Sequence, residues 1–158
     1  MEWRRTLCEV LWLLRHGDAA DGRPDDERPL TERGTQQSEW AGQALARLGV
    51  ELDACITSPK VRARETARLA CEPLGIEAIV DRRLAGEPFD PYELIAGLGE
   101  DVLLVGHDPS FSQTLHDLTG VQARMKKGGL AAISKGELMV LVSPRELRAI
   151  AGTRERVA

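Results

Sequence analysis

The chain has 158 residues and a formal net charge of −4 at pH 7, with hydrophobic (42%) and charged (29%) fractions typical of globular proteins. We expect a single domain over residues 1–158, with a core spanning about residues 10–152. The acidic balance argues against nucleic acid or an anionic membrane as a partner, and an aromatic content of 4% leaves few stacking platforms for single strands.

The first predicted strand covers residues 10–14, an apolar run without alternation, as expected for a strand buried on both faces. A charged loop with Gly and Pro follows over 18–29. Thr31 is a suitable N-cap for a helix over about 32–48, and Gly49 ends that helix.

The middle of the chain alternates between strands and helices. A second strand over 52–57 leads into Ser58-Pro59, which is expected to begin a helix that runs to about residue 74 with proline at its first position. A third strand over 76–80 precedes a loop and a short helix over 91–98. The fourth strand, over 102–105, is fully apolar.

After a turn, a helix is predicted over 110–118, followed by two strands over 130–134 and 137–142 that form a hairpin. Ser143-Pro144 begins a last short helix, and the tail from Thr153 is expected to be loose. Alternating strands and helices indicate an α/β fold of three layers. Its central sheet should be mostly parallel, flanked by helices on both faces, with an antiparallel element at the end.

The three cysteines, Cys8, Cys55 and Cys71, are odd in number and lack the close spacing of a zinc site. We therefore expect reduced thiols, no metal, and a cytoplasmic protein. The apolar run over 10–14 is too short to span a membrane, and it lacks a small-residue cleavage site, so neither a membrane segment nor a signal peptide is expected.

Polar motifs follow three of the predicted strands. They are Arg15-His16-Gly17, Thr57-Ser58-Pro59 with Arg62 one turn into the helix, and Gly106-His107-Asp108-Pro109. Because the carboxyl ends of parallel strands meet at one edge of a sheet, two histidines and two arginines are expected to converge there. An imidazole beside a fixed positive charge holds a proton poorly, which favours a neutral nitrogen nucleophile for a phosphate.

Four segments of the chain resemble, in the same order, the motifs of the histidine phosphatase superfamily, also called phosphoglycerate-mutase-like. They are Leu14-Arg15-His16-Gly17, Arg28-Pro29-Leu30-Thr31-Glu32-Arg33-Gly34, Ser58-Pro59-Lys60-Val61-Arg62-Ala63-Arg64-Glu65-Thr66 and Val105-Gly106-His107-Asp108-Pro109. The short stretch between Leu84 and Val102 is most similar to the compact bacterial protein phosphohistidine phosphatases. The resemblance implies the phosphoglycerate-mutase-like fold.

The resemblance also implies roles for individual residues. His16 would attack phosphorus and form a transient phosphohistidine. Arg15 and Arg62 would bind the phosphoryl oxygens through their planar guanidinium groups, with Arg28 as a third phosphate-binding arginine. His107 would donate a hydrogen bond to an equatorial phosphoryl oxygen. No metal or cofactor is needed, because arginine and histidine supply the positive field.

Several of these roles have ordinary structural alternatives. The general acid is expected to be Asp108, ahead of Glu87 and then Asp18, although Asp108 equally fits the N-cap of its helix, with Pro109 first. Arg28 alternatively pairs with the acidic residues at 25–27. The Lys126-Lys127-Gly128-Gly129 segment is expected to be a solvated turn, with an anion-attracting loop near the pocket as the alternative.

The expected activity is metal-independent hydrolysis of a phosphomonoester or phosphoramidate, with inorganic phosphate as product. Phosphohistidine in a partner protein is the preferred substrate, because a pocket without a large lid admits a protruding side chain. The alternatives are a small-molecule phosphatase acting on a sugar or nucleotide-derived phosphate, a mutase, and a non-catalytic module that binds a phosphorylated ligand. A mutase ranks low, because it must shield its phosphoenzyme from water.

Overall fold

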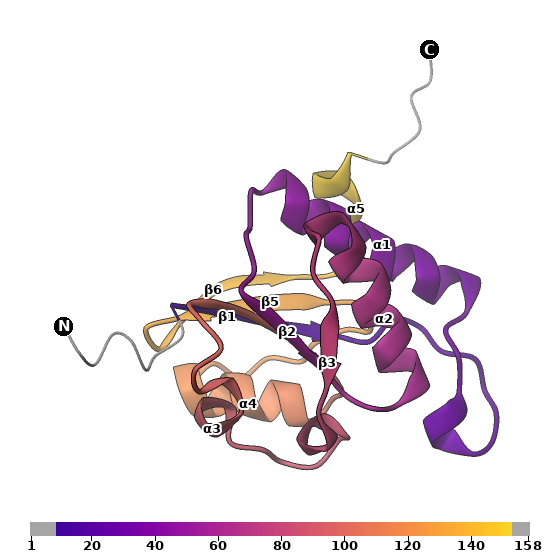
Figure 1. Cartoon of the computed structure of the whole chain (residues 1–158), viewed down its shortest axis with the longest axis horizontal. Coiled ribbons are helices and arrows are strands. Elements are labelled where there is room, and N and C mark those ends of the chain that lie inside the picture. The colour runs from indigo at the N-terminus through magenta and orange to yellow at the C-terminus, as the bar shows by residue number, and fades with distance from the viewer. Residues whose placement is uncertain (1–8, 153–158) are drawn as a thin grey trace.

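The computed structural model describes residues 9–152, and in it one six-stranded sheet separates two layers of helices (Figure 1). The strands lie in the order β3-β2-β4-β1-β5-β6. Their bounds are β1 Val10–Arg15, β2 Ala54–Thr57, β3 Ala78–Val80, β4 Asp101–Gly106, β5 Leu130–Ser134 and β6 Glu137–Val142. The helices are α1 Glu32–Arg47, α2 Val61–Cys71, α3 Pro91–Ile95, α4 Ser110–Thr119 and α5 Pro144–Ala151.

The four strands from β3 to β1 are parallel, and β5 and β6 add an antiparallel hairpin beside β1. This arrangement confirms the mostly parallel α/β sheet with an antiparallel end. Register aligns the carboxyl ends of the central strands, because Arg15 pairs with Gly106, and Thr57 pairs with Val105. The residues that follow β1, β2 and β4 therefore leave the sheet at one edge.

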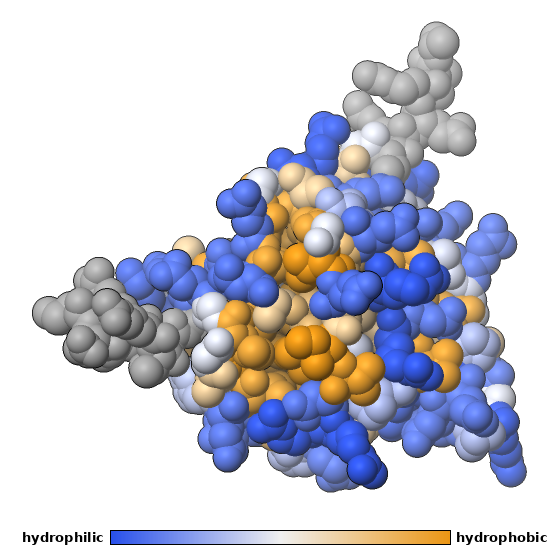
Figure 2. Space-filling view, viewed as in Figure 1, coloured by the Kyte–Doolittle hydropathy of each residue, from blue (hydrophilic) through white to orange (hydrophobic). Residues whose placement is uncertain are grey.

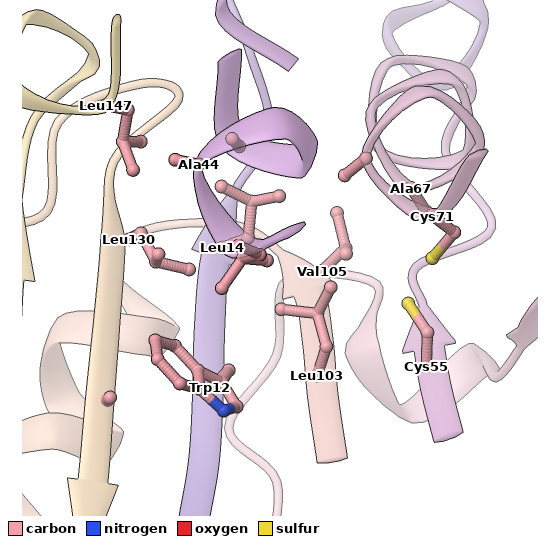
Figure 3. Packing of buried hydrophobic residues seen from close by; sticks show 14 of the residues in the cluster. Trp12, Leu14, Ala44, Cys55, Ala67, Cys71, Leu103, Val105, Leu130 and Leu147 are labelled. Atoms are coloured by element: carbon pink, nitrogen blue, oxygen red, sulfur yellow. The ribbon is translucent and has the colours of Figure 1, made fainter. Parts of the chain in front are cut away.

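Alternate residues of the buried strands pack on opposite faces of the sheet, and each face has its own helical layer. Trp12 and Leu14 of β1 pack in the cluster that contains α1, α2 and α5, where Leu14 lies against Ala44 and beside Val105 (Figure 3). Leu11 and Leu13 pack in the second cluster, with side chains of α3 and α4. Burial on both faces explains why the strand sequences are continuously apolar.

Close backbone contact fixes the segment that follows β1. A Cβ atom on Gly17 would lie 2.6 Å from the carbonyl oxygen of Gly34, and one on Gly34 would overlap the backbone of Asp18. The Gly17 amide also donates to Thr66 Oγ1 of α2 at 3.0 Å. Two glycines thus let the chain after β1 lie directly against the start of α1, which holds His16 in place.

Several predicted boundaries are wrong, and the one at α2 bears on the site. This helix begins at Val61, with Lys60 as its extended N-cap residue, rather than at Pro59. Ser58 Oγ accepts from the Lys60 amide at 3.2 Å, which forms a turn before the helix starts. The helix ends at Cys71, and 72–74 is a 3₁₀ turn.

Smaller differences occur elsewhere along the chain. The predicted loop over 18–29 contains a 3₁₀ turn at Asp25–Glu27, and the helix predicted over 91–98 stops at Ile95. β2 and β3 each begin two residues later than predicted. Helix α4 begins at Ser110 as predicted, but Pro109 is its N-cap residue and not its first helical residue.

On the face shown in Figure 2, an apolar area lies over the edge strand β3 at the centre of the view, with polar side chains around it. Ile79 and Val80 of this strand are 58% and 49% exposed. Within 9–152, no helix combines the length and apolar content needed to cross a bilayer. Cys55 and Cys71 are buried free thiols, and Cys8 lies outside the described residues.

Candidate functional site

The carboxyl edge of the sheet carries a pocket of about 370 Å³, here called the histidine pocket. It brings together the side chains that follow β1 and β4 and those at the start of α2. Its lining residues are Arg15, His16, Arg28, Lys60, Arg62, Ala85, Gly86, Glu87, His107, Asp108 and Lys127. Of the residues expected from the sequence to act in catalysis or phosphate binding, Asp18 alone does not line this pocket.

His16 is held as a neutral imidazole with one ring nitrogen unpaired. Its Nδ1 lies 2.7 Å from the carbonyl oxygen of Gly17. A carbonyl oxygen only accepts hydrogen bonds, so Nδ1 carries the proton, and the lone pair is on Nε2. Among the described residues, nothing hydrogen-bonds to Nε2.

Burial, together with the charges of Arg62 and Arg15, lowers the pKa of His16 to about 4, although the hydrogen bond to Gly17 acts in the opposite direction. The sequence interpretation credited the guanidinium groups, but the larger cause is burial, since His16 is only 6% exposed. At pH 7 the ring is therefore neutral, and Nε2 is available as a nucleophile.

His107 lies next to His16 with their ring centroids 5.1 Å apart and their planes tilted by 56°. Its Nε2 pairs with Ser58 Oγ at 2.7 Å, which ties the end of β4 to the end of β2. Burial, followed by the neighbouring His16 and Arg62, lowers the pKa of His107 to about 3. An anion bound between these groups would raise that pKa and favour a protonated donor.

Arg62 lines the pocket and is only 6% exposed, so its guanidinium is buried. Its Nη1 donates to the carbonyl oxygen of Asp25 at 2.8 Å, and its Nη2 donates to Asp25 Oδ2 at 3.1 Å. A planar fork that holds two oxygens at once in this way has the geometry to hold two oxygens of a phosphoryl group.

Arg28 lies between the pocket and the acidic loop. It lines the histidine pocket, and it also forms the ion pair with the acidic loop, since Nη1 lies 3.1 Å from Asp25 Oδ1. Its Nε donates to the carbonyl oxygen of Ala20 at 2.7 Å, which fixes the side chain across the loop.

Arg15 forms another wall of the pocket. Its Nη1 donates to the carbonyl oxygen of Met125 at 2.8 Å, and its Nε is buried without a hydrogen-bond partner. Lys127 lines the histidine pocket as well, so the segment lies near the pocket, as its alternative interpretation expected. Lys126 and Lys127 are both exposed, as expected for a solvated turn. The Gly128 amide, which donates to the carbonyl of His16 at 2.9 Å, holds the segment there.

The three candidate acids differ in the hydrogen bonds that their carboxylates accept. Asp108 accepts from the Ser112 amide at 2.9 Å and from Ser112 Oγ at 2.6 Å, so it acts as a cap for the first turn of α4. Asp18 accepts from Thr31 Oγ1 at 2.8 Å and faces a neighbouring cavity. Glu87 lines the histidine pocket and is exposed, and no side chain or amide of residues 9–152 holds its carboxylate.

Sequence reasoning missed three residues of this site. Asp25 contacts Arg28, Arg62 and Lys60, the last at 3.6 Å. Nothing in the spacing of a charged loop identifies which of its acids turns inward. Lys60 and Ser58 both belong to the motif after β2. Their polar side chains, on either side of Pro59, are the sequence feature that could have identified them as site residues.

The site therefore presents a neutral imidazole nitrogen among guanidinium and ammonium groups, a set suited to in-line attack on a phosphoryl group. Within residues 9–152, no three His, Cys, Asp or Glu side chains gather so as to hold a metal ion.

A model of the histidine phosphatase superfamily (branch 1) matches residues 11–95 of the chain. An uncharacterized protein of Picosynechococcus sp. is 31% identical, with 87% of this chain aligned to 98% of that protein. The mitochondrial serine/threonine-protein phosphatase Pgam5 of Drosophila melanogaster is 33% identical over 73% of this chain, which spans 38% of the Pgam5 length.

Among solved structures, the protein histidine phosphatase SixA complexed with tungstate superposes with a TM-score of 0.77. The two chains are 25% identical, and the match covers 87% of this chain and 99% of that one. The family model thus covers the segment that carries His16 and Arg62, and the solved structure shares the fold. The chain belongs to the histidine phosphatase superfamily, and it is a phosphatase.

Proposed function

We propose that the chain hydrolyses phosphohistidine side chains of proteins through a transient phosphohistidine on its own His16. The observation that carries this proposal is the buried, neutral His16 ring, whose unpaired Nε2 shares a pocket with the guanidinium of Arg62. A likeness to SixA, whose structure is named as that of a protein histidine phosphatase, supports the choice of substrate.

In the first step, His16 Nε2 attacks phosphorus while the bond between phosphorus and the substrate nitrogen breaks. The leaving imidazole nitrogen keeps the electron pair and takes a proton from an acid of the pocket. In the second step, water attacks the phosphoryl group on His16 and gives a proton back to that acid. The bond from phosphorus to Nε2 breaks, inorganic phosphate leaves, and the neutral imidazole is restored.

Arg62, Arg15 and Arg28 line the pocket and would bind the phosphoryl oxygens in both steps. His107 takes a proton as the dianion binds, because a nearby negative charge raises the pKa of an imidazole. It then donates to an oxygen that gains charge in the transition state. These groups provide the positive field around the transferred phosphoryl group.

The shape of the pocket supports a protein substrate. Between β3 and β4 the chain forms only a 3₁₀ turn at Arg82–Leu84 and the short helix α3. A phosphorylated side chain that protrudes from a partner can therefore reach Nε2 directly. The Pgam5 likeness favours phosphoserine or phosphothreonine as a second candidate. The buried free thiols of Cys55 and Cys71 fit a reducing compartment such as the cytoplasm.

A substrate comparison tests the proposal. The protein is incubated with the same peptide bearing phosphohistidine, phosphoserine or phosphothreonine, with a sugar phosphate and with a nucleotide monophosphate, and kcat/KM is measured for each. We expect phosphohistidine to have the highest value. A higher value for the sugar or nucleotide phosphate would establish a small-molecule phosphatase instead.

Glu87 is proposed as the proton donor ahead of Asp108, because the Asp108 carboxylate is already held by Ser112. Glu87→Gln is expected to lower kcat about 100-fold for an alkyl phosphate, whose leaving alcohol needs a proton, and far less for p-nitrophenyl phosphate. Asp108→Asn is expected to lower the unfolding free energy by about 1 kcal/mol, as a weakened helix cap, without that dependence on the leaving group. The opposite pattern would assign the acid to Asp108.

Asp25 places a carboxylate where it competes with a phosphate for Arg62 and Arg28. Hydrogen bonds from Arg28 and Arg62 lower the pKa of Asp25 to about 2, so the carboxylate stays ionised in any ordinary assay. Asp25→Asn removes this competitor and is expected to lower KM for p-nitrophenyl phosphate about two- to fivefold.

The matched control is Asp26→Asn, because Asp26 pairs only with Lys60, at 3.6 Å, among the described residues. We expect KM of this variant to stay near that of the wild type. A raised KM in Asp25→Asn would show that the carboxylate positions the arginines and does not compete with substrate.

A further inference from the structure

A second cavity of about 440 Å³ adjoins the histidine pocket, and its rim is strongly basic. We call it the basic pocket. Its charged lining comes from separate parts of the chain: Arg33 in the first turn of α1, Arg124 and Lys126 in the segment before β5, and Arg145 in the first turn of α5. On a chain with a net charge of −4, this cluster is a local feature.

The cations of the basic pocket are available to a ligand. Within residues 9–152, Arg33, Arg124, Lys126 and Arg145 take part in no ion pair, and all four are exposed. The carboxylate that lines this cavity belongs to Asp18, and it is held by Thr31 Oγ1 at 2.8 Å and lies 3.7 Å from Lys127 Nζ. The positive charges that line the cavity therefore outnumber the one carboxylate, that of Asp18, which lines it.

Two further acids lie next to these arginines in sequence. Glu146 adjoins Arg145, but its carboxylate accepts from the Ser143 amide at 2.8 Å and from Ser143 Oγ at 2.6 Å as the capping box of α5. Glu32 adjoins Arg33 and is exposed, and neither acid lines the cavity.

A buried amide supplies an independent sign of a ligand. Gln37 is 5% exposed, and its Oε1 accepts from the Asp18 amide at 2.8 Å. This hydrogen bond fixes the side chain, since the amide N–H of Asp18 must face an oxygen. Gln37 lines the cavity, and its Nε2 donates to no acceptor within the described residues. This amide N–H is therefore available to donate to an oxygen of a ligand.

The basic pocket shares part of its wall with the histidine pocket. Arg15 and Lys127 line both cavities, so the same two side chains can contact a ligand in either of them. The cations come from three separate parts of the chain, namely α1, the segment before β5, and α5. Such a field matches several carboxylates on an extended chain better than it matches a single compact group.

We propose that the basic pocket binds an acidic segment of the phosphoprotein, so that carboxylates flanking the phosphorylated residue contact Arg33 and Arg145 while the phosphoryl group lies at His16. This inference rests on the proposed function and narrows its substrates to phosphorylated side chains in an acidic sequence. Gln37 Nε2 donates to one of the oxygens of the segment.

The test compares two phosphohistidine peptides that differ only in whether Asp and Glu or Asn and Gln flank the phosphorylated residue. Each is assayed with the wild type, with Arg33→Gln/Arg145→Gln, and with the control Arg47→Gln/Arg68→Gln, which removes the same charge from residues outside both pockets. Arg124 is left intact because its charge acts on Arg15. All three proteins are also assayed with p-nitrophenyl phosphate.

The wild type is expected to have a roughly two- to thirtyfold higher kcat/KM for the acidic peptide, the range expected for two exposed ion pairs. Arg33→Gln/Arg145→Gln should lose this preference, while its p-nitrophenyl phosphate turnover and the preference of the control stay unchanged. Salt at about 1 M, where the screening length is about 3 Å, should also remove the wild-type preference.

Equal kcat/KM for both peptides in the wild type would overturn the proposal that the basic pocket binds an acidic segment. The phosphohistidine proposal would not be affected. Failure to hydrolyse either peptide, with p-nitrophenyl phosphate still turned over, would overturn both. A bisphosphorylated small molecule is the last substrate compared. If Arg33→Gln/Arg145→Gln lowers kcat/KM for this molecule but not for the acidic peptide, the basic pocket binds a second phosphate and not an acidic segment.

Discussion

Replacing His16 with alanine is expected to abolish turnover of every phosphorylated substrate, with kcat reduced by about 10⁴-fold or more. The loss is large because His16 Nε2 has no hydrogen-bond partner among the described residues and is free to attack, whereas Nε2 of the neighbouring His107 is paired with Ser58 Oγ. Initial rates with p-nitrophenyl phosphate and with a phosphohistidine peptide measure the effect.

The fold should survive this substitution. The His16 amide donates to the carbonyl of Gly106 at 3.0 Å, and alanine keeps this bond. Circular dichroism and thermal unfolding check the fold, and His116→Ala, an exposed histidine on α4, serves as the matched control with unchanged turnover. Retained activity in a folded His16→Ala protein would refute the role of His16 as the nucleophile.

Replacing Arg62 with alanine is expected to lower kcat/KM by about 10²- to 10³-fold, the usual cost of losing one donor to the charge of a transition state. Arg62→Lys should recover only part of the loss, because an ammonium group lacks the planar fork that matches two oxygens at once. The reason is visible in the structure, where Nη1 and Nη2 hold two oxygens of Asp25 together.

Arg64→Ala is the matched control for Arg62. Arg64 lies two residues further along α2, is exposed, and donates to the carbonyl oxygen of Pro59 at 2.9 Å. We expect its kcat/KM to stay within about twofold of the wild type, as for a surface substitution. Equal losses in the two variants would indicate that Arg62 acts through the stability of α2 and not through the phosphoryl group.

The sequence predicted the layers of the fold because its signals there are local. Continuous apolar runs, caps such as Thr31 and the glycines after helices each act over a few residues. The start of α2 was misplaced because Ser58 is shared between two partners, the Lys60 amide and His107 Nε2. The second partner is 49 residues away, and a local pattern of Ser followed by Pro does not report it.

The same distinction applies to the site. The edge where His16, Arg62 and His107 meet follows from the parallel order of strands, which the alternation of elements indicated. Whether an acid such as Asp108 is free or already bound depends on single hydrogen bonds, here to Ser112. The inward turn of Asp25 depends on contacts with two arginines that the folded loop brings together, so composition alone left it unassigned.

The most direct test of the central claim is to look for the covalent intermediate. The protein is mixed with a phosphohistidine peptide or p-nitrophenyl phosphate, quenched in alkali within milliseconds, digested, and analysed by mass spectrometry, with His16→Ala in parallel. The mass of one phosphoryl group is expected on His16, in an acid-labile form that decays as inorganic phosphate appears. Rapid turnover with a phosphoryl group on another residue, or with none at any quench time, would contradict the account.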